Sequence, residues 1–335
     1  MSARTVGSDD GGTADFRARA RARLLLLGSL VLAPLSAYVV WRSLRRERAG
    51  APSSVRDSAR RWERNTAASR STSAISDRLW AEVTGEVLPA RGFESRVRLG
   101  ASIVKLIEAG VIDPQKFGAL YRSRSGLSVE LERILAAPSD QPIVLTPGNA
   151  GDYVNLLWPV GLANHMSANE KSPLNGKSIS NFASTAGWTL GKEGNGSAYF
   201  NRFRIVALTP DEEARVTRIA RHTYRPCCNN STFFQDCNHG SALLGLLELG
   251  ASQGLTDDEL YREALTFNSF WFPRNYVETA IYFRVARGID WTHVDPREVM
   301  GFDYSAAGPW SRNVHAKLAG LPSVLRQQMG AACAT

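Results

Sequence analysis

The chain has 335 residues, 44% of them apolar, and it contains four cysteines. This length supports a large buried core, and the composition excludes a disordered tail, a disulfide-rich miniprotein and a collagen-like repeat. The net charge of +8 resides in residues 1–70, where 14 arginines face six acidic residues. Residues 71–335 carry equal numbers of basic and acidic side chains, so they lack the clustered positive charge that nucleic-acid binding requires, and we expect no nucleic-acid partner.

An uncharged apolar segment covers residues 24–41, after a basic N-terminal tail over residues 1–23. Its 18 residues predict a single-pass transmembrane helix of near-minimal length, with the lipid bilayer as its partner. Arginines that can reach the lipid headgroups lie on both sides: Arg17, Arg19, Arg21 and Arg23 before it, and Arg42, Arg45, Arg46 and Arg48 after it. A cleaved signal peptide is the alternative, but no small-residue cleavage site follows the segment.

Residues 42–75 are rich in Ala, Ser and Arg, which is typical of a juxtamembrane linker. The arginine counts on the two sides of the apolar segment barely discriminate between orientations. An N-terminal anchor followed by a long domain favours a body outside the cytoplasm. We therefore expect a protein of the inner membrane whose body lies in the periplasm.

The remaining chain is predicted to be mainly α, with one helical globular domain over residues 76–328 and a C-terminal tail over residues 329–335. Apolar residues recur at three- and four-residue steps through most of it. The Gly-rich stretch 141–208 is irregular, and only residues 142–146 and 204–208 suit short strands.

Four helices are predicted in the second half of the domain. Thr209-Pro210-Asp211-Glu212 begins a helix over residues 210–223, because Thr209 and Glu212 form a capping box around a Pro at the first helical position. Thr256 to Glu259 repeats the capping box for a helix that ends near Phe267. Two further helices are expected over residues 241–249 and 276–287.

The strongest chemical signal is a cluster of Cys227, Cys228, Cys237 and His239 between two of these helices. Thiolate and imidazole are the usual ligands of zinc, copper and iron, so the loop predicts a transition-metal site. Cys333 in the tail could supply a further thiolate. The spacing matches no standard zinc motif, and side chains of adjacent cysteines diverge in an extended chain. Two disulfides remain an alternative in an exported protein.

Cys237 also suggests a nucleophile, because it begins a helix whose N-terminus lowers a thiol pKa. The run from Gln235 to Leu244 resembles the start of papain-like cysteine peptidases. The resemblance implies Cys237 as the nucleophile and Gln235 as an oxyanion donor, with His293 or His315 as the distant base.

A longer pattern begins with Tyr224-Arg225-Pro226-Cys227-Cys228-Asn229-Asn230 and continues with Asp236-Cys237-Asn238-His239-Gly240. It resembles bacterial membrane-anchored or secreted proteins for which we know no activity. The likeness spans about residues 150–310 and implies a shared fold.

Three functions are consistent with the sequence. The first is a membrane-anchored extracytoplasmic protein whose loop binds a transition metal, in a structural or electron-handling role, or does thiol redox chemistry. The second is an accessory subunit of a larger membrane protein complex, with the loop stapled by disulfides. The third is a papain-like hydrolase that uses Cys237.

Overall fold

The computed structural model describes residues 57–58, 60–61, 77–124 and 126–319. The chain divides into two units, Met1–Ser71 and Thr72–Thr335. The basic tail, the apolar segment 24–41 and Cys333 lie outside the described residues. None of the helices in the described ranges has the length and apolar character that crossing a membrane requires.

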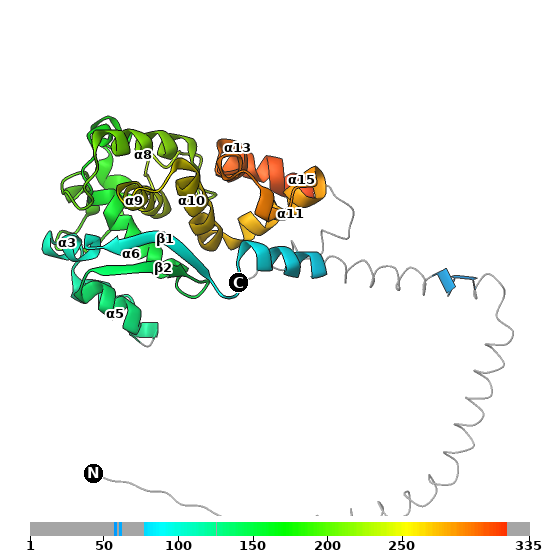
Figure 1. Cartoon of the computed structure of the whole chain (residues 1–335), viewed down its shortest axis with the longest axis horizontal. Coiled ribbons are helices and arrows are strands. Elements are labelled where there is room, and N and C mark those ends of the chain that lie inside the picture. The colour runs from blue at the N-terminus through cyan, green and yellow to red at the C-terminus, as the bar shows by residue number, and fades with distance from the viewer. Residues whose placement is uncertain (1–56, 59, 62–76, 125, 320–335) are drawn as a thin grey trace, which may run out of the picture. The chain divides into compact units, whose positions relative to one another are not determined.

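The second unit is mainly helical, as the sequence predicts, and contains one two-stranded sheet among its described residues. Figure 1 shows α3, α5 and the two strands at one end of this unit and α11, α13 and α15 at the other. A helix over residues 77–87 comes first. In chain order it is followed by β1 (Phe93–Gly100), α3 (Ser102–Glu108), α4 (Pro114–Ala119), η1 (Arg122–Arg124), α5 (Val129–Ala136), β2 (Ser139–Leu145), α6 (Ala150–Ala163), η2 (Ser167–Lys171), η3 (Ile179–Asn181), α7 (Ala183–Ala186), η4 (Gly196–Ala198), α8 (Pro210–His222), α9 (Asn238–Ser252), α10 (Asp257–Trp271), α11 (Pro273–Arg287), η5 (Trp291–His293), α12 (Pro296–Val299), α13 (Phe302–Ser305), α14 (Ala307–Trp310), η6 (Ser311–His315) and α15 (Ala316–Ala319).

The strands correct the sequence prediction in two places. Residues 142–146 fall largely within β2, as expected, but its antiparallel partner β1 was not predicted. In β1, buried Ser95, Val97 and Leu99 alternate with exposed charged residues, which is the period-2 pattern of a half-buried strand. Residues 204–208 form no strand. The preceding residue, Phe203, makes a single β-bridge to Asn164, but residues 204–208 themselves are irregular.

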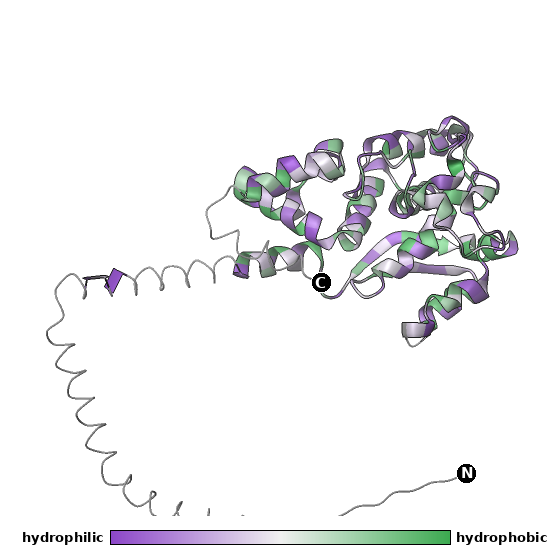
Figure 2. Cartoon of the chain, turned by 180° about the vertical axis from the view of Figure 1, so that it is seen from behind, coloured by the Kyte–Doolittle hydropathy of each residue, from purple (hydrophilic) through white to green (hydrophobic). Residues whose placement is uncertain are grey.

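The helix starts are confirmed at both predicted capping boxes. Thr209 accepts from the backbone of Glu212 at the start of α8, and Thr256 accepts from that of Glu259 at the start of α10. Other bounds differ from the prediction: α10 continues to Trp271, and α9 and α11 begin at Asn238 and Pro273 rather than at 241 and 276. Figure 2 shows hydrophilic and hydrophobic residues interspersed along the helices of this unit, which is typical of amphipathic helices.

The core is centred on α9, which is buried on every side from Gly240 to Ala251. It crosses α6 at a glycine contact. A Cβ on Gly161 would lie 2.1 Å from the Ser241 carbonyl oxygen, and one on Gly245 would lie 2.5 Å from the Leu157 carbonyl oxygen. Two backbones can approach this closely only where both helices lack a side chain. The crossing fixes the N-terminus of α9, where Cys237 lies.

We predict that Gly161→Ala destabilises the fold by about 3 kcal/mol, because the added methyl group would overlap the α9 backbone. Gly151→Ala on the same helix is the matched control, since a Cβ there meets no atom within 4 Å. That control should leave stability unchanged or raise it by up to about 1 kcal/mol through helix propensity. Chemical denaturation of both variants measures the difference, and equal stabilities would contradict the close crossing.

Candidate metal centre

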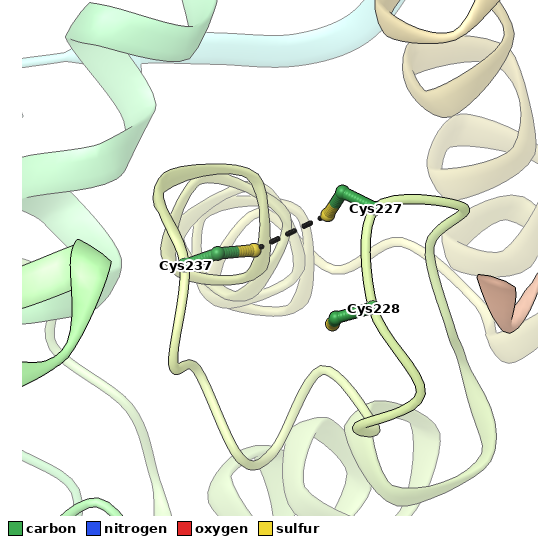
Figure 3. Close-up of side chains that lie close together, drawn as sticks. All are labelled: Cys227, Cys228 and Cys237. Atoms are coloured by element: carbon green, nitrogen blue, oxygen red, sulfur yellow. Dashed lines mark hydrogen bonds between the residues drawn. The ribbon is translucent and has the colours of Figure 1, made fainter.

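Cys227 and Cys228 project from a tight turn rather than from an extended chain. The Cys228 N–H donates to the carbonyl oxygen of Arg225 over 3.4 Å, which closes a four-residue turn with Pro226 in its second position. The turn removes the divergence that the sequence suggested for adjacent cysteines. Figure 3 shows both side chains on the side of the loop that faces Cys237.

The three cysteines form a compact group from two segments. Their sulfur atoms all lie within 4.8 Å of one another, and those of Cys227 and Cys237 are 3.4 Å apart. A disulfide bond is about 2.05 Å long, and none of the three cysteines forms one in the structure. Cys227 is exposed and the other two are partly buried, so the group is open to solvent on one side. This group could hold a metal ion.

Arg225 makes hydrogen bonds throughout the loop that carries the three cysteines. Its side chain is fully buried, yet each of its five N–H groups has an acceptor. Nε donates to the Cys237 sulfur over 3.1 Å, and one terminal nitrogen donates to the carbonyl oxygens of Asn230 and Ser231, each over 2.8 Å. The other terminal nitrogen donates to the Phe234 carbonyl oxygen and to the Asp236 carboxylate. The loop therefore closes around one cation.

Gly240 lets this arginine reach the helix. A Cβ at Gly240 would lie 2.5 Å from a terminal nitrogen of the Arg225 guanidinium. Any side chain at this position would push the guanidinium away from α9. The glycine in the first turn is therefore a packing requirement of the site.

Cys237 is the thiolate of the group. Its sulfur caps α9 by accepting from the Gly240 N–H over 3.3 Å. Hydrogen bonds from Cys227 and Cys228, together with the charge of Arg225, outweigh burial and hold the pKa of Cys237 far below its ordinary value. In Arg225, burial is the largest single effect and acts to lower the pKa, but the charge of Cys237, its hydrogen bond and the other two cysteines together outweigh burial and raise the pKa, so the cation persists.

The other two sulfurs stay protonated at neutral pH. Hydrogen bonds to Cys228 and Cys237, together with burial, raise the pKa of Cys227. The hydrogen bond with Cys227 lowers the pKa of Cys228, but the bond to Cys237 and burial raise it to about 11. The free site therefore holds one thiolate and two thiols.

His239 is not a member of the three-sulfur group. Its ring packs against Phe272, with centroids 4.6 Å apart, and against Trp271 at 5.9 Å. Burial lowers the pKa of His239, so its imidazole is neutral. The structure thus brings together three of the five predicted metal ligands and directs the imidazole toward an aromatic pair. Cys333 is outside the described residues.

The residues named by the papain-like resemblance lie as follows. His315 Nδ1 is 2.8 Å from the Glu278 carboxylate, and His293 Nδ1 is 3.1 Å from the Thr292 hydroxyl. The Gln235 side-chain oxygen accepts from the Ser241 hydroxyl over 2.7 Å. Within the described residues, neither histidine makes a hydrogen bond to Cys237.

Arg225 and Asp236 were not predicted as part of the site. Arg225 lies two residues before Cys227, and Asp236 directly precedes Cys237. Two opposite charges beside the cysteines are thus the only hint of their role that the sequence offers. The Asp236 carboxylate also accepts from the Asn230 side-chain amide over 2.7 Å and lies 3.7 Å from the Cys228 sulfur. A sequence does not reveal a fully buried arginine, because arginine is normally exposed. The loop contacts that bury it appear only in the fold.

Comparison with protein-family models, with curated proteins and with solved structures finds no match for this chain. The assignment of the site therefore depends on its own geometry and chemistry.

We predict that Arg225→Lys raises the pKa of Cys237 and destabilises the fold by about 3 kcal/mol or more. A lysine has three N–H donors and no planar fork, so it would leave several loop carbonyls without a donor. Thiolate ultraviolet absorbance measured against pH reports the first effect, and denaturation reports the second.

Arg262→Lys is the matched control, because Arg262 is exposed on α10. It should change neither the absorbance profile nor the stability. A thiolate profile in the Arg225→Lys variant identical to that of the wild type would show that Arg225 does not stabilise the charge on Cys237.

Proposed function

We propose that the protein binds one thiophilic transition-metal ion through Cys227, Cys228 and Cys237. The observation that carries the proposal is the mutual distance of the three sulfurs, all within 4.8 Å. Zinc–sulfur bonds of about 2.3 Å in tetrahedral geometry place sulfurs about 3.8 Å apart. The free site is thus near the geometry that the ion would require, and only small side-chain adjustments are needed.

The surroundings compensate the charge of such a site. Three thiolates around a divalent ion carry a net charge of −1, and around a monovalent ion −2. The Arg225 guanidinium donates directly to one sulfur and pairs with Asp236, so it offsets part of this negative charge. Hydrogen bonds to ligand atoms orient them and tune the metal, so Arg225 would act as the outer partner of the site.

The donor set favours monovalent copper or zinc. Thiolates select these ions over magnesium and calcium, which prefer oxygen ligands. No other His, Cys, Asp or Glu within the described ranges completes the three-sulfur group. A three-coordinate copper ion, or a zinc ion with a water molecule as fourth ligand, fits that number.

The proposed setting is the inner membrane, with the metal site on the periplasmic side. Its support is the uncharged apolar run over residues 24–41 between clusters of arginines. The chain would act there alone or as a subunit of a membrane protein complex. A reporter enzyme that is active only in the periplasm, fused after residue 335, tests this orientation, and an expressed but inactive fusion would refute it.

We predict that the full chain binds one zinc or one monovalent copper ion, and that Cys237→Ser and Cys228→Ser each weaken binding at least about 100-fold. Titration calorimetry and elemental analysis measure affinity and stoichiometry. Cys333→Ser tests separately whether the tail supplies a ligand, which would appear as weakened binding. Equal binding by the wild type and by a variant lacking Cys227, Cys228 and Cys237 would refute the proposal.

The pH dependence of binding follows from the protonation of the free site. Cys237 is already a thiolate, whereas Cys227 and Cys228 must each lose a proton to bind. Acid therefore competes with the metal, and affinity rises with pH. Between about pH 6 and pH 8, we expect the dissociation constant to fall about 100-fold per pH unit, which corresponds to two protons released. A release of three protons would contradict the thiolate at Cys237.

A further inference from the structure

A large cleft lies between α8 and the irregular segment 203–208, and its lining includes none of the three cysteines. Its volume is about 840 Å³, within the range of about 300–1,000 Å³ that small-molecule sites occupy. One wall is a face of α8, and the other combines segment 203–208 with the residues that follow α6. Apolar side chains, among them Val206, Leu208 and Ala214, form part of this lining.

Hydrogen bonds hold the walls of the cleft in place. The His165 N–H donates to the Phe203 carbonyl oxygen over 2.8 Å, and the Val206 N–H donates to the Asn164 side-chain oxygen over 2.9 Å. The Ala168 N–H donates to the Glu213 carboxylate over 2.8 Å, which joins η2 to α8. The cleft is therefore formed before any ligand arrives.

The cleft is positively charged. Arg204 and Arg221 line it, and within the described residues neither guanidinium pairs with a carboxylate. Arg221 instead lies over the Phe233 ring at 4.6 Å from its centroid. A third arginine of the lining, Arg218, pairs with Asp257, which does not line the cleft. Glu213 is the only acidic residue of the lining, and one of its oxygens already accepts from Ala168.

Buried polar atoms without a partner occur in the lining of the cleft and next to it in the chain. Among the described residues, the Thr217 hydroxyl and both polar atoms of the Asn169 side chain lack a hydrogen-bond partner. Thr217 lines the cleft, and Asn169 follows the lining residue Ala168 in the chain. Buried polar groups without partners are rare in folded proteins and call for a bound water or ligand.

Glu248 lies on α9, which packs against α8. Burial raises the pKa of its carboxyl group well above the ordinary value, and the nearby Asn164 side chain offsets this effect only in part. Burial thus favours the uncharged form of this carboxyl group.

We propose that this cleft binds a small organic phosphate, with the phosphate group at Arg204 and Arg221 and an apolar body against Val206 and Leu208. Guanidinium groups recognise phosphate oxygens through paired hydrogen bonds. An unpaired arginine on each wall supplies two such groups. Inorganic phosphate would leave the apolar part of the lining exposed to water. An organic phosphate that covers this surface is therefore expected to bind more tightly.

Calorimetric titration of the full chain with three probes tests the proposal. Phenyl phosphate carries both the charge and the apolar body, inorganic phosphate carries only the charge, and phenol carries only the ring. We expect phenyl phosphate to bind at least about tenfold more tightly than either of the others. Equal binding of phenyl phosphate and inorganic phosphate, equal binding of phenyl phosphate and phenol, or no binding at all would overturn the proposal.

Charge reversal locates the binding site. The double variant Arg204→Glu with Arg221→Glu should bind phenyl phosphate at least about tenfold more weakly, and circular dichroism verifies that it is folded. Arg262→Glu, which changes an exposed residue on α10 outside the cleft lining, is the matched control and should bind as the wild type does. Unchanged affinity in the double variant would place the anion elsewhere and overturn the proposal.

The source of the phosphate is distinguished by a fourth probe. A water-soluble short-chain phosphatidic acid carries the same phosphate monoester on a lipid. Tighter binding than phenyl phosphate would support the proposal with a lipid headgroup as ligand. Weaker binding would support it with a soluble phosphate ester as ligand.

Discussion

The buried guanidinium of Arg225 is the interaction on which the loop between α8 and α9 depends. An uncompensated charge in the protein interior is very costly, and here the cost is offset because all five N–H groups have acceptors on one short segment. The same contacts bend the chain so that residues ten positions apart meet. The position of Cys237 relative to Cys227 and Cys228 is thus a consequence of solvating one cation with the protein's own atoms.

The rigidity of α9 gives this arrangement a fixed base. Its apolar residues face the core on all sides, and it crosses α6 where two glycines allow backbone contact. A helix held so firmly presents its first N–H groups in a fixed direction, and the Cys237 sulfur receives one of them. The electrostatic stabilisation of the thiolate therefore combines a helix terminus with a cation that cannot move away.

The two proposed sites use arginine in different ways: Arg225 is buried, whereas Arg204 and Arg221 are exposed. At the cysteines, a cation is enclosed and every donor is satisfied, so the surrounding loop is rigid. In the cleft, Arg204 and Arg221 remain without carboxylate partners, and the buried Thr217 hydroxyl in the same lining lacks a hydrogen bond. The first arrangement suits a site that holds an ion in one geometry, whereas the second leaves binding capacity for a ligand from solution.

The sequence by itself determined the helical class, the two capping boxes and the segment in which the cysteines gather. These features depend on neighbours within a few residues, through helical periodicity and local hydrogen bonds. The alternation in β1 was also present in the sequence, although it was not predicted. Tertiary structure decided which side chains meet: it turned Cys227 and Cys228 to one side, directed His239 toward Phe272 and buried Arg225. Those outcomes depend on contacts between distant segments, such as the bond from the Ala307 N–H to the Cys228 carbonyl oxygen, and no local pattern encodes them.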